Sequence, residues 1–196
     1  MTELADLDIA SPIARAIAEG AMPGRVWLYT NYHCNLACSY CLTESSPRSE
    51  RRQLEPTTML AVAEQAKERG FTGLGVTGGE PFLLPWLPET VVEMASHLPV
   101  VVLTNATLFG GDRIERAALM AHPNISVQIS LDSHLPDVND MARGADNFAK
   151  VVEAVPKLIE RGVRVRIATT TAGPLDAAEL DPLRELVASM GVAADD

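Results

Sequence analysis

The stretch "GLGVTGGEPFLLPWLPETVVEMASHLPVVVLT", residues 73–104, contains a strand, a helix and a second strand in succession. Apolar and β-branched residues dominate 73–77 and 100–104, whereas 87–97 has the apolar spacing and the strong helix formers of an amphipathic helix. Two strands joined by a helical crossover lie parallel in one sheet, and such crossovers are almost always right-handed. This stretch therefore predicts a parallel α/β fold.

The same unit recurs from Arg25 onward. Further strands are expected at 26–30, 125–132 and 163–170, and further helices at 57–70, 111–122, 145–162 and 176–191. Pro156 is expected to kink the fourth of the long helices or to begin its second half. Five strand and helix units predict either an open doubly wound sheet or part of a barrel. A complete eightfold barrel is excluded, because it needs about 250 residues.

Composition limits the partners of the chain. Its 196 residues carry a formal net charge of -10, so it lacks the positive field on which binding to nucleic acid or to an anionic membrane depends. The acidic N-terminus does not resemble a secretory signal, and no stretch has the length of a membrane span. Three clustered cysteines fit a reduced compartment better than a disulfide framework. We therefore expect a cytoplasmic protein that binds neither nucleic acid nor a membrane.

Unusual polar motifs follow four successive predicted strands. They are the cysteine segment "TNYHCNLACSYCLTESSP" (30–47), "TGGEP" (77–81), "TNATL" (104–108) and "SLDS" (130–133). In parallel α/β folds, ligands bind beyond the carboxyl ends of the strands. The four motifs are therefore expected to meet in one site.

The cysteines Cys34, Cys38 and Cys41 leave three interpretations open. An iron-sulfur cube held by three thiolates keeps one iron free for chemistry. A structural zinc ion needs a fourth ligand, and His33 lies immediately next to Cys34, where it is poorly placed to share one ion with that thiolate. A redox pair of Cys38 and Cys41 gives Cys34 no task. Spacing and position favour the cluster.

The motifs "CNLACSYC", "GGEP", "TNATL", "SLDS" and "ARG" (142–144) together resemble the radical S-adenosylmethionine (radical SAM) superfamily. The resemblance runs from about Arg25 to Thr171 and is closest to the branch of peptide-modifying and sulfatase maturases and of cofactor-biosynthesis enzymes. It implies a partial (β/α)6 TIM-type barrel over 25–196, preceded by a helical extension over 1–24. Within this extension, residues 7–20 are expected to form one amphipathic helix, interrupted or begun at Pro12, that closes one end of the barrel rather than gating the substrate. Because only five units are present, a sixth strand is expected beyond this chain.

The resemblance also assigns roles to residues. The three cysteines would bind a [4Fe-4S] cluster whose free iron takes S-adenosylmethionine. The cofactor would contact Tyr40 through its adenine, Gly78, Gly79 and Glu80 through its methionine ammonium, and Ser130 and Asp132 through its ribose hydroxyls. Asn105 and Arg143 are weaker candidates, for its polar groups and its carboxylate. Ala106 stands where the family commonly has glycine, which puts a close backbone approach there in doubt.

The implied function is reductive cleavage of S-adenosylmethionine to a 5'-deoxyadenosyl radical that abstracts hydrogen, with a peptide or peptide-derived natural product as the favoured substrate. Alternatives are a step in small-molecule cofactor biosynthesis and a noncatalytic iron-sulfur or zinc module. An electron donor such as flavodoxin or ferredoxin is an expected partner. The remaining histidines (His97, His122, His134) are expected at the surface or in turns. Four methionines within or beside the predicted helices (Met59, Met94, Met120, Met141) are expected in packing.

Overall fold

The computed structural model describes residues 11–171, 173 and 176–193 and contains one sheet of five parallel strands. The strands lie in chain order, β1 (Arg25–Tyr29), β2 (Gly73–Thr77), β3 (Val100–Thr104), β4 (Ile125–Ser130) and β5 (Val165–Ala168). In the registers, Tyr29 pairs with Thr77 and Thr104 with Ile129. All five strands therefore end at the same edge of the sheet.

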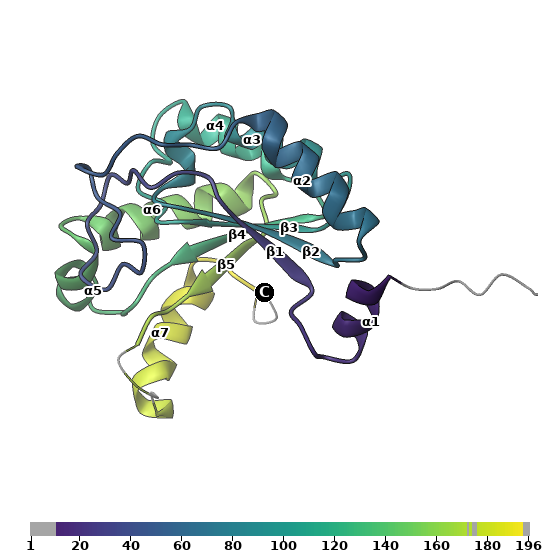
Figure 1. Ribbon diagram of the computed structural model, residues 1–196. Helices are drawn as coiled ribbons and strands as arrows, with labels where there is room; N and C mark the ends of the chain where they lie inside the picture. The colour runs from purple at the N-terminus through teal and green to yellow at the C-terminus, as the bar shows by residue number, and fades with distance from the viewer. Residues whose placement is uncertain (1–10, 172, 174–175, 194–196) are drawn as a thin grey trace, which may run out of the picture.

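Helices cover one face of the sheet. Figure 1 shows α2 (Pro56–Glu68), α3 (Leu87–Met94), α4 (Arg113–Ala117) and α6 (Asn147–Glu160) on that side. The short helices η1 (Pro81–Leu83) and η2 (Ala118–Met120) follow β2 and α4, α5 (Pro136–Arg143) precedes α6, and α7 (Ala177–Ser189) follows β5. Alternate strand residues such as Val76, Val102 and Ile129 are completely buried beneath the helices. This apolar layer is the core, and its burial is the main source of stability.

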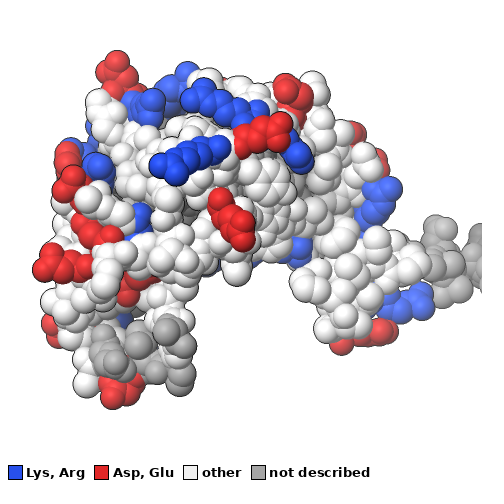
Figure 2. Space-filling model, turned by 60° about the vertical axis from the view of Figure 1, so that its left-hand side comes forward, with Lys and Arg blue, Asp and Glu red and all other residues white. Residues whose placement is uncertain are grey.

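The opposite face of the sheet is concave and open. Trp27 and Tyr29 of β1 lie on it and are 44% and 45% exposed. The Trp27 ring lies over Gly75 of β2, where any Cβ atom would overlap the indole. Figure 2 shows the molecule hollowed on the side away from the covering helices. The sheet therefore presents a broad aromatic floor toward this hollow.

The first helix, α1 (Pro12–Ala18), packs against the end of α2. Ser11 caps it by accepting a hydrogen bond from the Ala14 amide, and its hydroxyl also donates to the Arg69 carbonyl at 2.6 Å. Ala14 closes on Gly70, where an added Cβ atom would meet the Ala14 side chain. A helix was expected over about 7–20, interrupted or begun at Pro12. The structure begins α1 at Pro12, and residues 7–10 lie outside the described residues.

Several expectations about the elements are confirmed and others are corrected. β2 and β3 have the predicted bounds, but the helix expected at 111–122 is divided into α4 and η2. α6 runs through Pro156 as one continuous helix, so Pro156 does not begin a second half. Helix α5 was not anticipated, and Met141 on it is 79% exposed, so its assignment to packing is wrong. The other three helical methionines are buried, as expected.

Candidate functional site

The carboxyl ends of the strands surround a cavity of 670 Å³. Clefts of this size typically hold cofactors and other small molecules. All three cysteines line it, together with residues that follow β1, β2, β3 and β4, as the motif order predicted. Its lining residues include Trp27, Tyr29, Cys34, Leu36, Cys38, Tyr40, Cys41, Gly78, Gly79, Leu103, Thr104, Asn105, Ser130, Arg143 and Thr170.

The cysteine loop gives each thiol a different surrounding. Burial raises the pKa of Cys34 to about 11, although its sulfur accepts a hydrogen bond from the Leu36 amide at 3.4 Å. Burial likewise raises the pKa of Cys38. At Cys41 burial is outweighed by hydrogen bonds, including one from the Ser45 amide at 3.3 Å, and the pKa is lowered. Cys41 therefore ionises most readily of the three.

The donor set suits an iron-sulfur cluster. Three thiols from one loop face one cavity, and amide donors already point at two of the sulfurs, as is usual where thiolates hold a cluster. Among the described residues, no group of three or more His, Cys, Asp or Glu side chains could hold a single metal ion. A cube attaches each thiolate to a different iron, so its ligands need not converge on one point.

The two glycines after β2 lie directly against the cysteine loop. The Gly79 amide donates to the Asn31 carbonyl at 2.9 Å and to the Asn31 side chain at 3.1 Å. Gly78 has a φ of 151°, and a Cβ atom there would lie 2.6 Å from the Asn31 carbonyl oxygen. At Gly79 a Cβ atom would overlap the His33 carbonyl. Glycine is therefore required at both positions to bring the two loops into contact.

The Glu80 carboxylate is buried and bonded to the protein itself. Glu80 is 1% exposed. Its carboxylate accepts hydrogen bonds from the backbone amide of Phe82 at 3.0 Å, the Thr104 hydroxyl at 2.8 Å and the backbone amide of Asn105 at 2.8 Å. Burial nevertheless raises its pKa to about 7. Glu80 thus joins the loops after β2 and β3. Its expected contact with a cofactor ammonium stays a prediction.

Asp132 and Arg143 form a buried ion pair beneath Tyr40. Arg143 contacts both carboxylate oxygens, at 2.7 Å and 3.1 Å, and the two side chains are 6% and 9% exposed. The Thr170 amide and the Tyr40 hydroxyl also donate to Asp132. The Arg143 guanidinium lies 5.5 Å from the centroid of the Tyr40 ring. Donors from the protein itself therefore bond to the Asp132 carboxylate, whereas Ser130 lines the cavity. The expected contacts of Ser130 and Asp132 with the cofactor ribose stay predictions.

Tyr40 and Asn105 both line the cavity, as their predicted roles require. Burial and the hydrogen bond to Asp132 raise the pKa of the Tyr40 phenol, which keeps it protonated. The side-chain nitrogen of Asn105 donates to the Cys34 sulfur at 3.7 Å. The next residue, Ala106, is buried with a φ of 58°, so this position adopts the left-handed backbone that glycine favours.

A chain of buried amides connects the cysteine loop to the end of β4. The Asn105 carbonyl accepts from the side chain of Asn147 at 3.4 Å, and the Asn147 oxygen accepts from Asn139 at 2.9 Å. The Asn139 oxygen in turn accepts from the Asp132 amide at 3.0 Å. Asn139 and Asn147 are fully buried. The ends of β3 and β4 are thus held together through α5 and α6.

Sequence reasoning missed Asn31, Thr104, Asn139 and Asn147. One signal was available for the first two, since β1 and β3 both lead into a Thr-Asn pair, at 30–31 and 104–105. The amides of α5 and α6 gave no such signal.

The histidines outside the cysteine loop lie in turns or at helix ends and are partly exposed, as expected. On the described part of β5, Arg166 has a buried Nε without a hydrogen-bond partner.

A family model identifies this arrangement. The model of the Radical SAM superfamily matches residues 28–187. The chain belongs to the radical SAM superfamily. The resemblance recognised in the motifs is therefore confirmed, and with it an iron-sulfur cluster and S-adenosylmethionine as the cofactors of the family.

Two curated relatives illustrate the range of this family. Mycofactocin maturase MftC of Mycobacterium ulcerans (strain Agy99) is 32% identical over 151 residues, which cover 74% of this chain and 40% of MftC. A probable GTP 3',8-cyclase of Archaeoglobus fulgidus is 29% identical over 161 residues, covering 80% of this chain and 52% of the cyclase. The chain thus spans between two fifths and about half of the length of these relatives.

Among solved structures, Streptococcus suis SuiB bound to S-adenosylmethionine superimposes with a TM-score of 0.73 at 17% identity. The match covers 91% of this chain and 41% of SuiB. SuiB has also been solved bound to its precursor peptide SuiA. At this identity the likeness concerns the fold, and it confirms the predicted partial barrel. The described residues contain no helix that is long and apolar enough to cross a membrane.

Proposed function

We propose that this chain forms the cofactor-binding part of a radical SAM enzyme, with one [4Fe-4S] cluster on Cys34, Cys38 and Cys41. One observation carries the proposal: the three thiols face the same 670 Å³ cavity as Gly78, Gly79 and the strand-end residues of β3 and β4. No fourth cysteine exists in the chain. Three thiolates on a cube leave one iron available to a small chelating ligand.

When bound, the cluster would supply the electron that cleaves S-adenosylmethionine to methionine and a 5'-deoxyadenosyl radical, which takes a hydrogen atom from the substrate. The chain itself would bind and orient the cofactor and exclude competing reactions. Gly78 and Gly79 bring their backbone to the cavity wall, where it can face the cofactor ammonium. Glu80 fixes the two loops behind them through its three hydrogen bonds. Ser130 and Tyr40 offer hydroxyl and aromatic surfaces to the ribose and adenine.

A peptide or a peptide-derived natural product is the proposed substrate. Similarity to a mycofactocin maturase, and in fold to SuiB, which binds a precursor peptide, supports this choice. The concave face of the sheet also offers Trp27 and Tyr29 beside the cavity, a broad apolar surface for a large substrate. The proposed electron donor is a reduced protein such as flavodoxin or ferredoxin. The proposed location is the cytoplasm, because three free thiols suit a reducing compartment.

Small-molecule cofactor biosynthesis is the second candidate. Similarity to a probable GTP 3',8-cyclase over 80% of this chain supports it. The two candidates share the cofactor site and differ in what lies over the concave face. They are separated by the substrate that turns over, not by the chemistry at the cluster.

Anaerobic reconstitution tests the proposal directly. The chain, supplied with iron, sulfide and dithionite, is expected to become brown and to bind about four irons. With S-adenosylmethionine it is expected to release equal amounts of methionine and 5'-deoxyadenosine, measured by chromatography. Colourless protein that retains zinc and leaves S-adenosylmethionine intact would instead support the noncatalytic binding module.

A further inference from the structure

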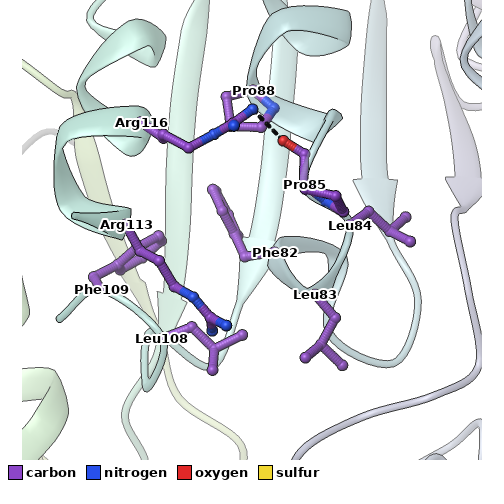
Figure 3. Close-up of a pocket in the computed structure, with 9 residues that line it drawn as sticks. All are labelled: Phe82, Leu83, Leu84, Pro85, Pro88, Leu108, Phe109, Arg113 and Arg116. Carbon is purple, nitrogen blue, oxygen red and sulfur yellow. Dashed lines mark hydrogen bonds between the residues drawn. The ribbon is translucent and has the colours of Figure 1, made fainter. Parts of the chain in front are cut away.

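A second pocket lies outside the cysteine cavity, on the far side of the loop that holds Glu80. It has a volume of 150 Å³ and lies between η1, the start of α3 and the segment that leads from β3 into α4. Figure 3 shows the side chains that surround it. Its lining residues are Phe82, Leu83, Leu84, Pro85, Pro88, Leu108, Phe109, Arg113 and Arg116.

The floor of this pocket is apolar. Phe82 and Phe109 meet edge to face, with ring centroids 4.6 Å apart, and Phe109 is 5% exposed. Pro85 and Pro88 form the wall toward α3 (Figure 3). An apolar cavity of about 150 Å³ in another protein is large enough to bind benzene. This pocket therefore has room for one large apolar side chain.

Two arginines stand at opposite sides of the Phe82 ring (Figure 3). Arg116 is already paired with both carboxylate oxygens of Glu89, at 2.7 Å and 2.9 Å, and donates to the Pro85 carbonyl. The guanidinium of Arg113 has no hydrogen bond or ion pair within the described part of the chain. Arg113 therefore offers a cation at the rim of the apolar pocket, in a chain that carries 26 acidic and 16 basic residues.

We propose that this pocket docks the substrate peptide at a point away from the reacting residue. A leucine or phenylalanine of the peptide enters between Phe82 and Pro88, and an acidic residue next to it pairs with Arg113. The arrangement follows interfaces in which an apolar anchor fills a pocket and a charge at the rim selects the sequence. This inference rests on the proposed function in one respect, that the substrate is a peptide.

The pocket adjoins the cofactor site through shared backbone. Phe82, which forms its floor, donates its amide hydrogen to Glu80, and Leu108 and Phe109 lie just beyond Asn105, which does the same. The two loops joined by Glu80 therefore have the cysteine cavity on one side and this pocket on the other. A peptide held here is anchored to the same loops that position the cofactor.

Three labelled peptides test the proposal by fluorescence anisotropy at low salt. The probe is fluorescein-GSLFEEGS, and the comparison peptides are fluorescein-GSLFKKGS and fluorescein-GSSSEEGS. Wild-type chain is expected to bind the first at least about fivefold more tightly than either of the others, since both the apolar anchor and the charge are needed. Equal affinities for all three peptides would overturn the proposal.

Charge reversal gives the matched comparison. Arg113→Glu is expected to weaken binding of the LFEE peptide at least about fivefold and to favour the LFKK peptide instead. Arg15→Glu makes the same change on α1, far from the pocket, and is expected to leave all affinities unchanged. Leu108→Ala is expected to weaken both LF peptides alike, with folding checked by circular dichroism. Equal effects of the two reversals would refute a role for Arg113.

The docking site and the proposed function fail in different ways. Formation of 5'-deoxyadenosine by wild type without added peptide tests the proposed function separately, and Arg15→Glu is expected to leave it unchanged. If wild type cleaves S-adenosylmethionine but does not discriminate among the peptides, the docking site is wrong and the function stands. If it does not cleave, the function is wrong. A structure of a longer form of the protein, with its own chain filling the pocket, would also overturn the docking site.

Discussion

Replacement of Glu80 by glutamine is expected to change how the stability of the cluster-free chain depends on pH. Burial raises the pKa of the Glu80 carboxyl from its usual 4.5 to about 7. Between these values the folded chain keeps a proton on Glu80 that the unfolded chain has released. Stability contributed by this proton is present at low pH and is lost as the pH rises through 7, because the buried carboxyl must then ionise.

The magnitude follows from the two pKa values. Proton linkage predicts that Glu80 lowers the free energy of unfolding by about 2 kcal/mol between pH 5.5 and pH 7.5. Glutamine cannot ionise, so this slope disappears in the variant. Glutamine also has one acceptor oxygen in place of two, which leaves one buried donor among Phe82, Thr104 and Asn105 unpaired at a cost of about 1 to 3 kcal/mol. That cost is the same at every pH.

Urea denaturation at pH 5.5, 6.5 and 7.5, followed by tryptophan fluorescence under reducing conditions, measures both effects. At pH 5.5 Glu80→Gln is expected to be less stable than wild type, and by pH 7.5 the difference is expected to shrink by about 2 kcal/mol. Glu64→Gln, at an exposed position of α2, controls for the loss of one negative charge. Parallel pH curves for wild type and Glu80→Gln would refute the assignment of the raised pKa to Glu80.

Three further predictions concern the site. Alanine at any cysteine is expected to remove most of the bound iron and all cleavage of S-adenosylmethionine; a variant with full iron and normal turnover contradicts the cluster assignment. Asp132→Asn is expected to lower the free energy of unfolding by about 3 kcal/mol, because Arg143 stays buried without its counter-charge; a loss below about 1 kcal/mol by urea denaturation rejects this. Gly79→Ala is expected to cost about 2 kcal/mol or more, since the new methyl group overlaps the His33 carbonyl, and an unchanged melting temperature argues against it.

The sheet was predictable because its strands differ sharply from their surroundings. β3 is four apolar residues and a threonine, preceded by Pro99 and followed by a polar turn, so both bounds are visible in the sequence. Helix α5 was missed for the opposite reason. Its sequence, "PDVNDMAR", buries Asn139 and Arg143 and exposes Val138 and Met141, so an apolar periodicity cannot reveal it. A helix that buries polar groups is recognisable only once their partners are known.

The site was predictable as a set of loops, because parallel strands bring their carboxyl ends together, and all four motifs line or support one cavity. The hydrogen-bond and ion-pair partners of individual side chains were not predictable. Glu80 accepts from Thr104 at the end of the next strand and from Asn105 just after it, and sequence spacing does not predict such a pairing. The Asp132 and Arg143 pair depends likewise on α5 folding back over β4.

The buried amide chain limits how proteins with this site can diverge. Asn139 and Asn147 bond to each other through their side chains, and each also bonds a backbone group beyond a strand end: Asn139 accepts from the Asp132 amide, and Asn147 donates to the Asn105 carbonyl. A lone replacement of either asparagine therefore takes a partner from the other and from a backbone group. Neutral drift at one of the two positions must be matched at the other, and the two are expected to be inherited as a compensated pair. A chimera that takes α5 from one protein and α6 from another would join halves of different pairs, so neither helix can be exchanged without the inner face of the other.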